Sequence, residues 1–232
     1  MVAGHSLGEF SALVAAGVLA FSDAVRIVRL RGQAMQGAVP VGEGAMAAVL
    51  GLDDEAINTI CAEASVNGDT QVLAVNFNSP GQVVIAGHAA AVQSASVALK
   101  AAGAKRILPL PVSAPFHTPL MQPAAVILEE ALADVSVADA QMPVISNVDA
   151  GPHVSGASIA QLLVKQVVAP VQWTACVQRM ISVGGTAFIE CGPGKVLAGL
   201  LRRIDRSKSC YCIESPEALL EALNQLAEVS DV

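Results

Sequence analysis

A serine flanked by glycines stands near the start of the chain, in the sequence GHSLG at residues 4–8. The spacing G-x-S-x-G lets a strand turn sharply into a helix and leaves the serine oxygen exposed at the turn. The N-terminal amides of that helix point toward Ser6, so the Leu7 N–H can stabilise an oxyanion. The alternative is a glycine-flanked helix start without chemistry. Because apolar residues precede the turn and a helical pattern follows it, we favour a nucleophile elbow with Ser6 as nucleophile.

A serine hydroxyl is a weak nucleophile near neutral pH and needs a base. The chain holds 4 histidines. His5 is adjacent to the serine, where neighbouring side chains diverge, His88 opens a helix, and His153 lies in a polar loop. His117 falls where the chain re-enters its main core after a predicted subdomain. A lone loop histidine is more often structural, but elimination and placement favour His117 as the base.

The elements that must position these residues alternate between helices and strands, as in an α/β protein. Residues 9–19 and 21–39 have the apolar spacing of two helices. Residues 44–112 then follow the order strand, helix, strand, strand, helix, strand, which is ferredoxin-like. We therefore predict a catalytic core formed by residues 1–43 and 113–232, with residues 44–112 as an inserted subdomain.

Composition excludes several classes of protein. The 232 residues are 53% hydrophobic, which suffices for a sizeable core. An aromatic content of 3% and a formal net charge of −7 argue against nucleic-acid binding and against anionic membranes. No apolar run approaches the roughly 20 residues of a membrane-spanning helix, and the N-terminus does not resemble a signal peptide. The 5 cysteines contain no CxxC pair, so we expect reduced thiols, no metal site and a cytoplasmic protein.

Six segments, in order over nearly the whole chain, carry a family resemblance. They are GHSLGEFSALVAAG at residues 4–17, RGQAM at 31–35, NFNSPGQVVIAG at 76–87, PFHTPLM at 115–121, PVQW at 170–173 and GPGKVL at 192–197. Together they resemble the malonyl-CoA:acyl carrier protein transacylases of bacterial type II fatty acid synthesis. The resemblance implies an α/β-hydrolase-like core with a parallel sheet and an inserted ferredoxin-like subdomain. It also implies malonyl transfer from CoA to the phosphopantetheine thiol of acyl carrier protein, without a metal or other cofactor.

The resemblance implies a catalytic dyad. Ser6 matches the acyl-accepting nucleophile, and His117 matches the base that takes its proton. The main-chain carbonyl of Gln166 matches the group that holds the second imidazole nitrogen, so the imidazolium is less stabilised than in a Ser-His-Asp triad. The implied mechanism is ping-pong: Ser6 attacks the malonyl thioester, CoA leaves, and the carrier thiol then attacks the malonyl-serine.

The resemblance also implies residues that bind the substrate. Arg31 matches the arginine that holds the malonyl carboxylate bidentately and selects malonyl over acetyl, whereas the residues alone favour a solvated arginine. Asn76 and Asn78 match subdomain residues near the acyl pocket, although asparagines at strand ends are as often turn formers. Phe116 occupies the position at which related polyketide acyltransferases carry Phe when they take malonyl. A single methyl group is worth only about 1–3 kcal/mol of discrimination, so Phe116 is a supporting observation.

Three matters stay open. A serine esterase or thioesterase would use the same elbow and base with water as acceptor, and a non-catalytic truncated fragment would serve only as a binding module.

The family has a segment before the serine, with a GQGSQ-like loop that completes the oxyanion hole. Loss of one oxyanion donor typically costs about 100- to 1,000-fold in rate, so we expect an N-terminally truncated chain that is weak or inactive. The carrier protein or the CoA phosphates would dock near basic residues that otherwise form a solvated helix end: Lys195, Arg202, Arg203, Arg206 and Lys208.

Overall fold

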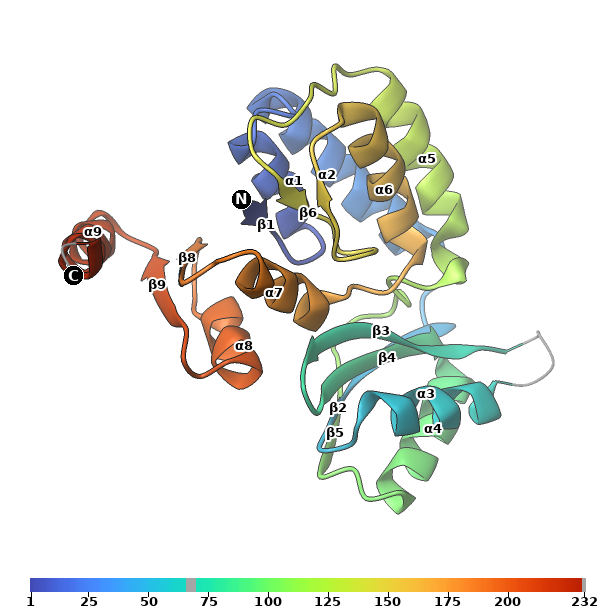
Figure 1. The fold of residues 1–232 in the computed structure, drawn as a ribbon. Coiled ribbons are helices and arrows are strands. Elements are labelled where there is room, and N and C mark those ends of the chain that lie inside the picture. Colours follow the sequence, from blue (N-terminus) through green and yellow to red (C-terminus); the bar gives the residue numbers. More distant parts are fainter. Residues whose placement is uncertain (66–69, 231–232) are drawn as a thin grey trace. The chain divides into compact units, whose positions relative to one another are not determined.

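The computed structural model describes residues 1–65 and 70–230. The chain divides into two compact units, Met1–Cys176 and Val177–Val232, and each is described by itself (Figure 1). Helix α7, Trp173–Ser182, begins in the first unit and ends in the second. The domain boundaries expected from the sequence follow a different division and stay a prediction.

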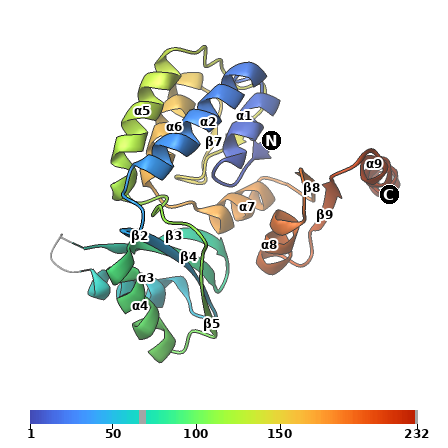
Figure 2. The same cartoon turned by 180° about the vertical axis from the view of Figure 1, so that it is seen from behind.

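A small sheet surrounded by helices forms the core of the first unit. Strand β1 (Val2–Ala3) pairs in parallel with β6 (Val144–Ile145), and β7 (Pro152–His153) pairs antiparallel with β6. Helices α2, α5 and α6 lie side by side next to this sheet (Figures 1 and 2). The helical elements are α1 (Gly8–Ala15), α2 (Phe21–Gly37), the 3-10 helix η1 (Pro119–Met121), α5 (Gln122–Ala133) and α6 (Gly156–Val168).

Buried apolar side chains from these helices meet β6 in one continuous core, with Phe10, Leu13 and Leu163 each at most 1% exposed. The predicted α/β core with parallel strand pairing is thus confirmed. The prediction that His153 lies in a polar loop was wrong, because Pro152 and His153 form strand β7. A strand of two residues is too short to produce a periodic pattern, and only its pairing with β6 reveals it.

A second sheet of the first unit is antiparallel and has the order β3-β4-β2-β5. Helices α3 and α4 cover one face of it, where Val49, Ile57 and Ile85 are fully buried. The strand order and the helix placement confirm the predicted ferredoxin-like arrangement. Its elements are β2 (Gly44–Leu50), α3 (Asp54–Ala64), β3 (Val72–Ser79), β4 (Gln82–His88), α4 (Ala89–Ala101) and β5 (Arg106–Pro109).

Strand β3 also bonds to the segment that leads into α7. The Phe77 N–H donates to the Val171 carbonyl at 3.0 Å, and the Val171 N–H donates to the Val75 carbonyl at 2.8 Å. These bonds fix the end of β3 against the part of the unit that carries the nucleophile elbow. Two asparagines of the acyl-pocket prediction, Asn76 and Asn78, lie on this stretch of β3.

The second unit is built on two parallel strands, β8 (Ala187–Cys191) and β9 (Ser209–Ile213), joined by α8 (Val196–Ile204). The last helix, α9 (Pro216–Ser230), begins after Ser215, whose hydroxyl oxygen accepts the Ala218 N–H at 3.2 Å. Several apolar side chains of this unit are exposed, among them Ile189, Val196 and Leu220. Within the described ranges, no helix combines the length and apolar character that a membrane span needs.

Candidate active site

Ser6 lies on a strained turn between β1 and α1. Its φ is 51°, in the left-handed region, where a non-glycine residue costs about 1–3 kcal/mol. Gly4 makes the turn possible, because a Cβ at this residue would lie 1.9 Å from the Gly8 carbonyl oxygen. The Asn147 side chain fixes the turn by accepting the Ser6 N–H at 2.6 Å and donating to the Gly4 carbonyl at 2.8 Å. Over residues 1–65 and 70–230, no group accepts the Leu7 N–H.

The structure brings His117 to the serine. His117 is 4% exposed, and its Nε2 lies 2.8 Å from Ser6 Oγ. Its Nδ1 lies 2.8 Å from the main-chain carbonyl of Gln166, which can only accept, so Nδ1 carries the proton and Nε2 faces the hydroxyl as acceptor. Burial lowers the pKa of His117 to about 3, so the imidazole is a neutral base at physiological pH.

The buried neutral imidazole predicts how stability changes in acid. His117 is unprotonated in the folded chain down to about pH 3, whereas in the unfolded chain it binds a proton near pH 6.5. The unfolded state therefore holds more protons between these pH values, and the free energy of unfolding falls as pH drops from 6.5 toward 3. We expect a loss of roughly 3 to 5 kcal/mol that a His117→Asn variant does not show. Chemical denaturation of both proteins at several pH values measures it, and parallel curves would contradict it.

Arg31 of α2 reaches the same serine oxygen. Its Nη2 donates to Ser6 Oγ and to Gln166 Oε1, each at 3.0 Å, and its guanidinium lies 5.7 Å from the centre of the Phe10 ring. The side chain is 5% exposed, and burial lowers its pKa to about 10, which leaves it a cation at neutral pH. Its Nε is buried and has no hydrogen-bond partner among the described residues. This unused donor can bind an anionic group beside Ser6.

Two polar groups of the site were missed by the sequence analysis, Glu9 and the side chain of Gln166. The Gln166 amide nitrogen donates to Glu9 Oε2 at 2.7 Å and to the Ser6 carbonyl at 3.1 Å, and the residue is fully buried. Glu9 is 2% exposed and also accepts the Asn147 N–H at 3.2 Å. The available signal was an acidic residue inside an otherwise apolar helical stretch, because a carboxylate at a buried position needs partners.

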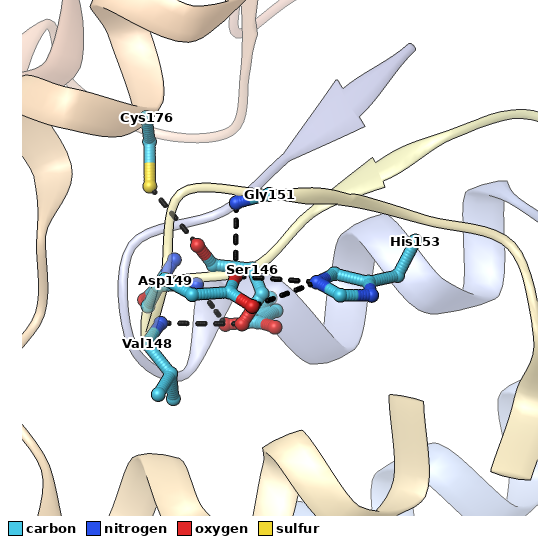
Figure 3. Close-up of polar contacts among 8 residues, drawn as sticks. Ser146, Val148, Asp149, Gly151, His153 and Cys176 are labelled. Atoms are coloured by element: carbon cyan, nitrogen blue, oxygen red, sulfur yellow. Dashed lines mark hydrogen bonds and ion pairs between the residues drawn. The ribbon is translucent and has the colours of Figure 1, made fainter. Parts of the chain in front are cut away.

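Asn147, the third group missed, stands on a tight loop after β6. Figure 3 shows that the carboxylate of Asp149 on this loop binds His153, with Nε2 at 3.0 Å from Oδ2. The Cys176 Sγ–H donates to the Ser146 carbonyl at 3.2 Å (Figure 3). These bonds join the loop to β7 and to α7, while Asn147 binds the elbow through its own side chain. A polar residue at the end of an apolar strand was the signal available for it in the sequence.

The remaining predicted residues lie at different distances from the serine–histidine pair. Asn78 Oδ1 accepts a hydrogen bond from His5 Nε2 at 2.7 Å, and the His5 ring lies 5.5 Å from the Trp173 ring. Asn76 is 6% exposed on β3, and Phe116 is half-buried between two apolar clusters. In the described part of the chain, no hydrogen bond joins Asn76 to the pair. The structure therefore brings Ser6, His117, Arg31 and Gln166 together. Asn78 is bonded to His5, which precedes Ser6 in the chain.

One group of potential metal ligands occurs within the second unit. Ligand atoms of Glu190, Cys210 and Cys212 lie within 4.8 Å of one another. The Glu190 carboxylate already accepts the Leu197 and Ala198 N–H groups at 3.0 and 2.8 Å, so it caps α8. Burial raises the pKa of the Cys210 thiol to about 11, which disfavours the thiolate that a metal needs. We assign no metal to this group.

A half-buried serine on a strained strand-to-helix turn, bonded to a neutral imidazole, defines the class of α/β proteins with a serine nucleophile. The acyl transferase domain family matches residues 1–215. The malonyl CoA-acyl carrier protein transacylase of Escherichia coli K12 is 53% identical over 224 residues, 96% of this chain and 72% of that relative. The chain belongs to the malonyl CoA-acyl carrier protein transacylase family.

Solved structures agree with this family. The acyl-carrier-protein S-malonyltransferase of Burkholderia pseudomallei superposes with a TM-score of 0.93 at 53% identity, covering 96% of this chain and 72% of that one. A malonyl-transacylase in complex with a type II PKS acyl-carrier protein gives a TM-score of 0.92 at 48% identity, covering 96% and 72%. At these identities the likeness extends beyond the fold to the family.

Proposed function

We propose that the chain transfers a malonyl group from CoA to the phosphopantetheine thiol of acyl carrier protein through a malonyl ester of Ser6. One observation carries this proposal: Ser6 Oγ lies 2.8 Å from the His117 acceptor nitrogen and 3.0 Å from the Arg31 guanidinium. A nucleophile, a base and a buried cation thus meet at one oxygen. The family relatives are named for this reaction, which supports the assignment.

The first half-reaction acylates the serine. His117 Nε2 takes the proton of Ser6 as Oγ attacks the malonyl thioester carbonyl, and the resulting oxyanion is stabilised by the free Leu7 N–H. The imidazolium then gives its proton to the departing CoA sulfur. The Gln166 carbonyl, at 2.8 Å from Nδ1, keeps the ring oriented throughout.

The second half-reaction uses the same groups in reverse. His117 takes the proton of the carrier's phosphopantetheine thiol, the sulfur attacks the malonyl-serine carbonyl, and Ser6 leaves as it regains a proton. Each step moves protons and one acyl group only, so we propose that no metal or other cofactor takes part. A cytoplasmic location stays a prediction.

Arg31 determines which acyl group is accepted. Its unused Nε and the Nη2 proton that is donated to Ser6 Oγ before acylation form a fork that matches the free carboxylate of a malonyl group on Ser6. An acetyl group offers no such acceptor and leaves the buried Nε of Arg31 without a hydrogen-bond partner. We further propose that Asn76, Asn78 and Phe116 shape the space around the acyl group.

An open cavity in the second unit fits an anionic partner. It has a volume of about 700 Å³ and is lined by basic side chains together with Glu214 and Glu221. We propose that the CoA phosphates or the acidic carrier protein dock there, by charge complementarity. The basic residues are Lys195, Arg202, Arg206 and Lys208 in the lining, with Arg203 on the same helix.

A serine esterase or thioesterase is the alternative that the same dyad would serve. Incubating the chain with labelled malonyl-CoA, with and without the holo carrier protein, separates the two. We expect a malonyl-protein that persists in buffer and passes its label to the carrier thiol. Rapid release of free malonate with no labelled carrier would favour hydrolysis, and no labelled protein would favour a binding fragment.

A further inference from the structure

Glu9 is a buried ionisable group that no step of the proposed mechanism uses. It is 2% exposed, and Arg31 is 5% exposed. The two side chains are bridged by the Gln166 side chain, whose Nε2 donates to Glu9 Oε2 at 2.7 Å and whose Oε1 accepts from Arg31 Nη2 at 3.0 Å. A carboxylate and a guanidinium are therefore linked through a single amide, and the same amide also donates to the Ser6 carbonyl.

Elementary electrostatics makes this arrangement sensitive to the charge of the acyl group. A buried guanidinium is costly unless an anion compensates its charge, and Glu9 supplies that anion in the free protein. A second carboxylate arriving at Arg31 would place two anions and one cation in the same buried volume. Like charges disfavour ionisation, so the less well bonded carboxyl group is driven to bind a proton.

We propose that Glu9 is a specificity-determining positioning residue, whose carboxylate neutralises Arg31 in the free protein and takes up one proton when a carboxylate-bearing acyl group binds at Arg31. This inference rests on the proposed function. The proton comes from solvent and forms an O–H bond on Glu9 Oε1. Oε2 can then keep its bonds to Gln166 and to the Asn147 N–H, so the support of the elbow survives the change of charge.

The groups around Glu9 set its proton affinity in a useful range. Burial raises the pKa of Glu9 to about 7, and Asp149 adds to this rise. The bonds from Gln166 and Asn147 and the charge of Arg31 act in the opposite direction. Cys176 also faces this cluster, with a thiol that burial keeps protonated. A malonyl carboxylate at Arg31 raises the pKa of Glu9 further, so at pH 8 an ionised Glu9 becomes protonated on binding.

Calorimetry measures this proton directly. Malonyl-CoA is titrated into a Ser6→Ala chain, which cannot be acylated, at pH 8 in two buffers with different ionisation enthalpies. We expect an uptake approaching one proton per malonyl-CoA bound. Acetyl-CoA carries the same phosphates without the carboxylate, so it serves as the matched ligand, with no uptake beyond that of CoA itself.

A second variant assigns the proton to Glu9. In Glu9→Gln the amide oxygen can accept both existing hydrogen bonds, while the titratable charge is lost. We expect the uptake to vanish in Ser6→Ala/Glu9→Gln. We also expect the affinity for malonyl-CoA, which in Ser6→Ala falls by up to about tenfold per pH unit above pH 7, to become flat with pH.

The outcomes separate the inference from the function on which it rests. Preferential binding of malonyl-CoA over acetyl-CoA without proton uptake overturns the role of Glu9 and leaves the proposed function intact. Equal affinity for the two ligands, or binding of neither, overturns the proposed function as well. If Glu9→Gln does not fold in thermal unfolding, the comparison of the two ligands on Ser6→Ala still decides the question.

Discussion

Replacing His117 with alanine lowers the rate of acylation by malonyl-CoA by about 10²- to 10⁴-fold. The reason is geometric, because Ser6 Oγ has its acceptor nitrogen at 2.8 Å and loses it in the variant. Attack then requires a hydroxyl whose proton has no base, while the Leu7 N–H and the binding of the substrate remain. The rate is followed by rapid acid quench and mass spectrometry of the malonyl-protein.

His153→Ala is the matched control for this variant. His153 is also bonded through Nε2, but to Asp149 at 3.0 Å, and it contacts neither Ser6 nor Arg31 among the described residues. Its removal should leave the acylation rate within a few-fold of the parent. Similar rate losses in His117→Ala and His153→Ala would show that His117 acts through stability and not as the base.

Replacing Arg31 with alanine lowers the ratio of kcat/KM for malonyl-CoA to kcat/KM for acetyl-CoA by about 10- to 150-fold. The reason is that a hydrogen bond to a charged group is worth about 1.5–3 kcal/mol. The loss falls on malonyl-CoA, whose carboxylate no longer finds the guanidinium, whereas acetyl-CoA has no group to lose. Arg31→Lys keeps a charge but not the planar fork, so it should recover only part of the preference.

Arg26→Ala provides the control on the same helix. Its side chain is 75% exposed and pairs with Asp23, so its removal changes the net charge of the chain equally without touching the site. We expect the ratio of kcat/KM for malonyl-CoA and acetyl-CoA to stay at the parent value. An unchanged ratio in Arg31→Ala would remove the substrate role of this residue.

The elements of the chain were largely predictable because their signals are local. The strained turn at residues 4–8 follows from the glycine spacing, and Gly4 is indeed required where a Cβ would meet the Gly8 carbonyl. The ferredoxin-like order of residues 44–112 follows from alternating helical and strand periodicity. Strand β7 was not foreseen, because a two-residue strand is recognised only through a partner that it meets in the folded chain.

The site residues that belong to a sequence motif were predictable, whereas the residues that reach the site only through tertiary packing were not. Nothing local in the sequence indicates that the Gln166 side chain joins Glu9 to Arg31, since this requires α1, α2 and α6 to meet. Asn147 was missed for the same reason, because its partners lie 141 and 143 residues away. Buried hydrogen-bond networks of this kind become visible only once the backbone brings their members together.

The weak or absent activity expected in the sequence analysis stays a prediction. The chain spans 72% of the length of its E. coli relative. Leu7 is the N-cap of α1, and we propose its N–H as the oxyanion donor of the elbow. Rates measured for the variants above should therefore be compared with the parent chain and not with a relative.

The position of the acyl group after a single turnover shows whether Ser6 is the nucleophile of the transfer. The chain is mixed with malonyl-CoA, quenched in acid and digested, and the malonyl-bearing peptide is identified by mass spectrometry. We expect a malonyl ester on Ser6 that is absent from Ser6→Ala and is discharged by the carrier thiol. A malonyl group found on another residue, or an equal yield from Ser6→Ala, would contradict it.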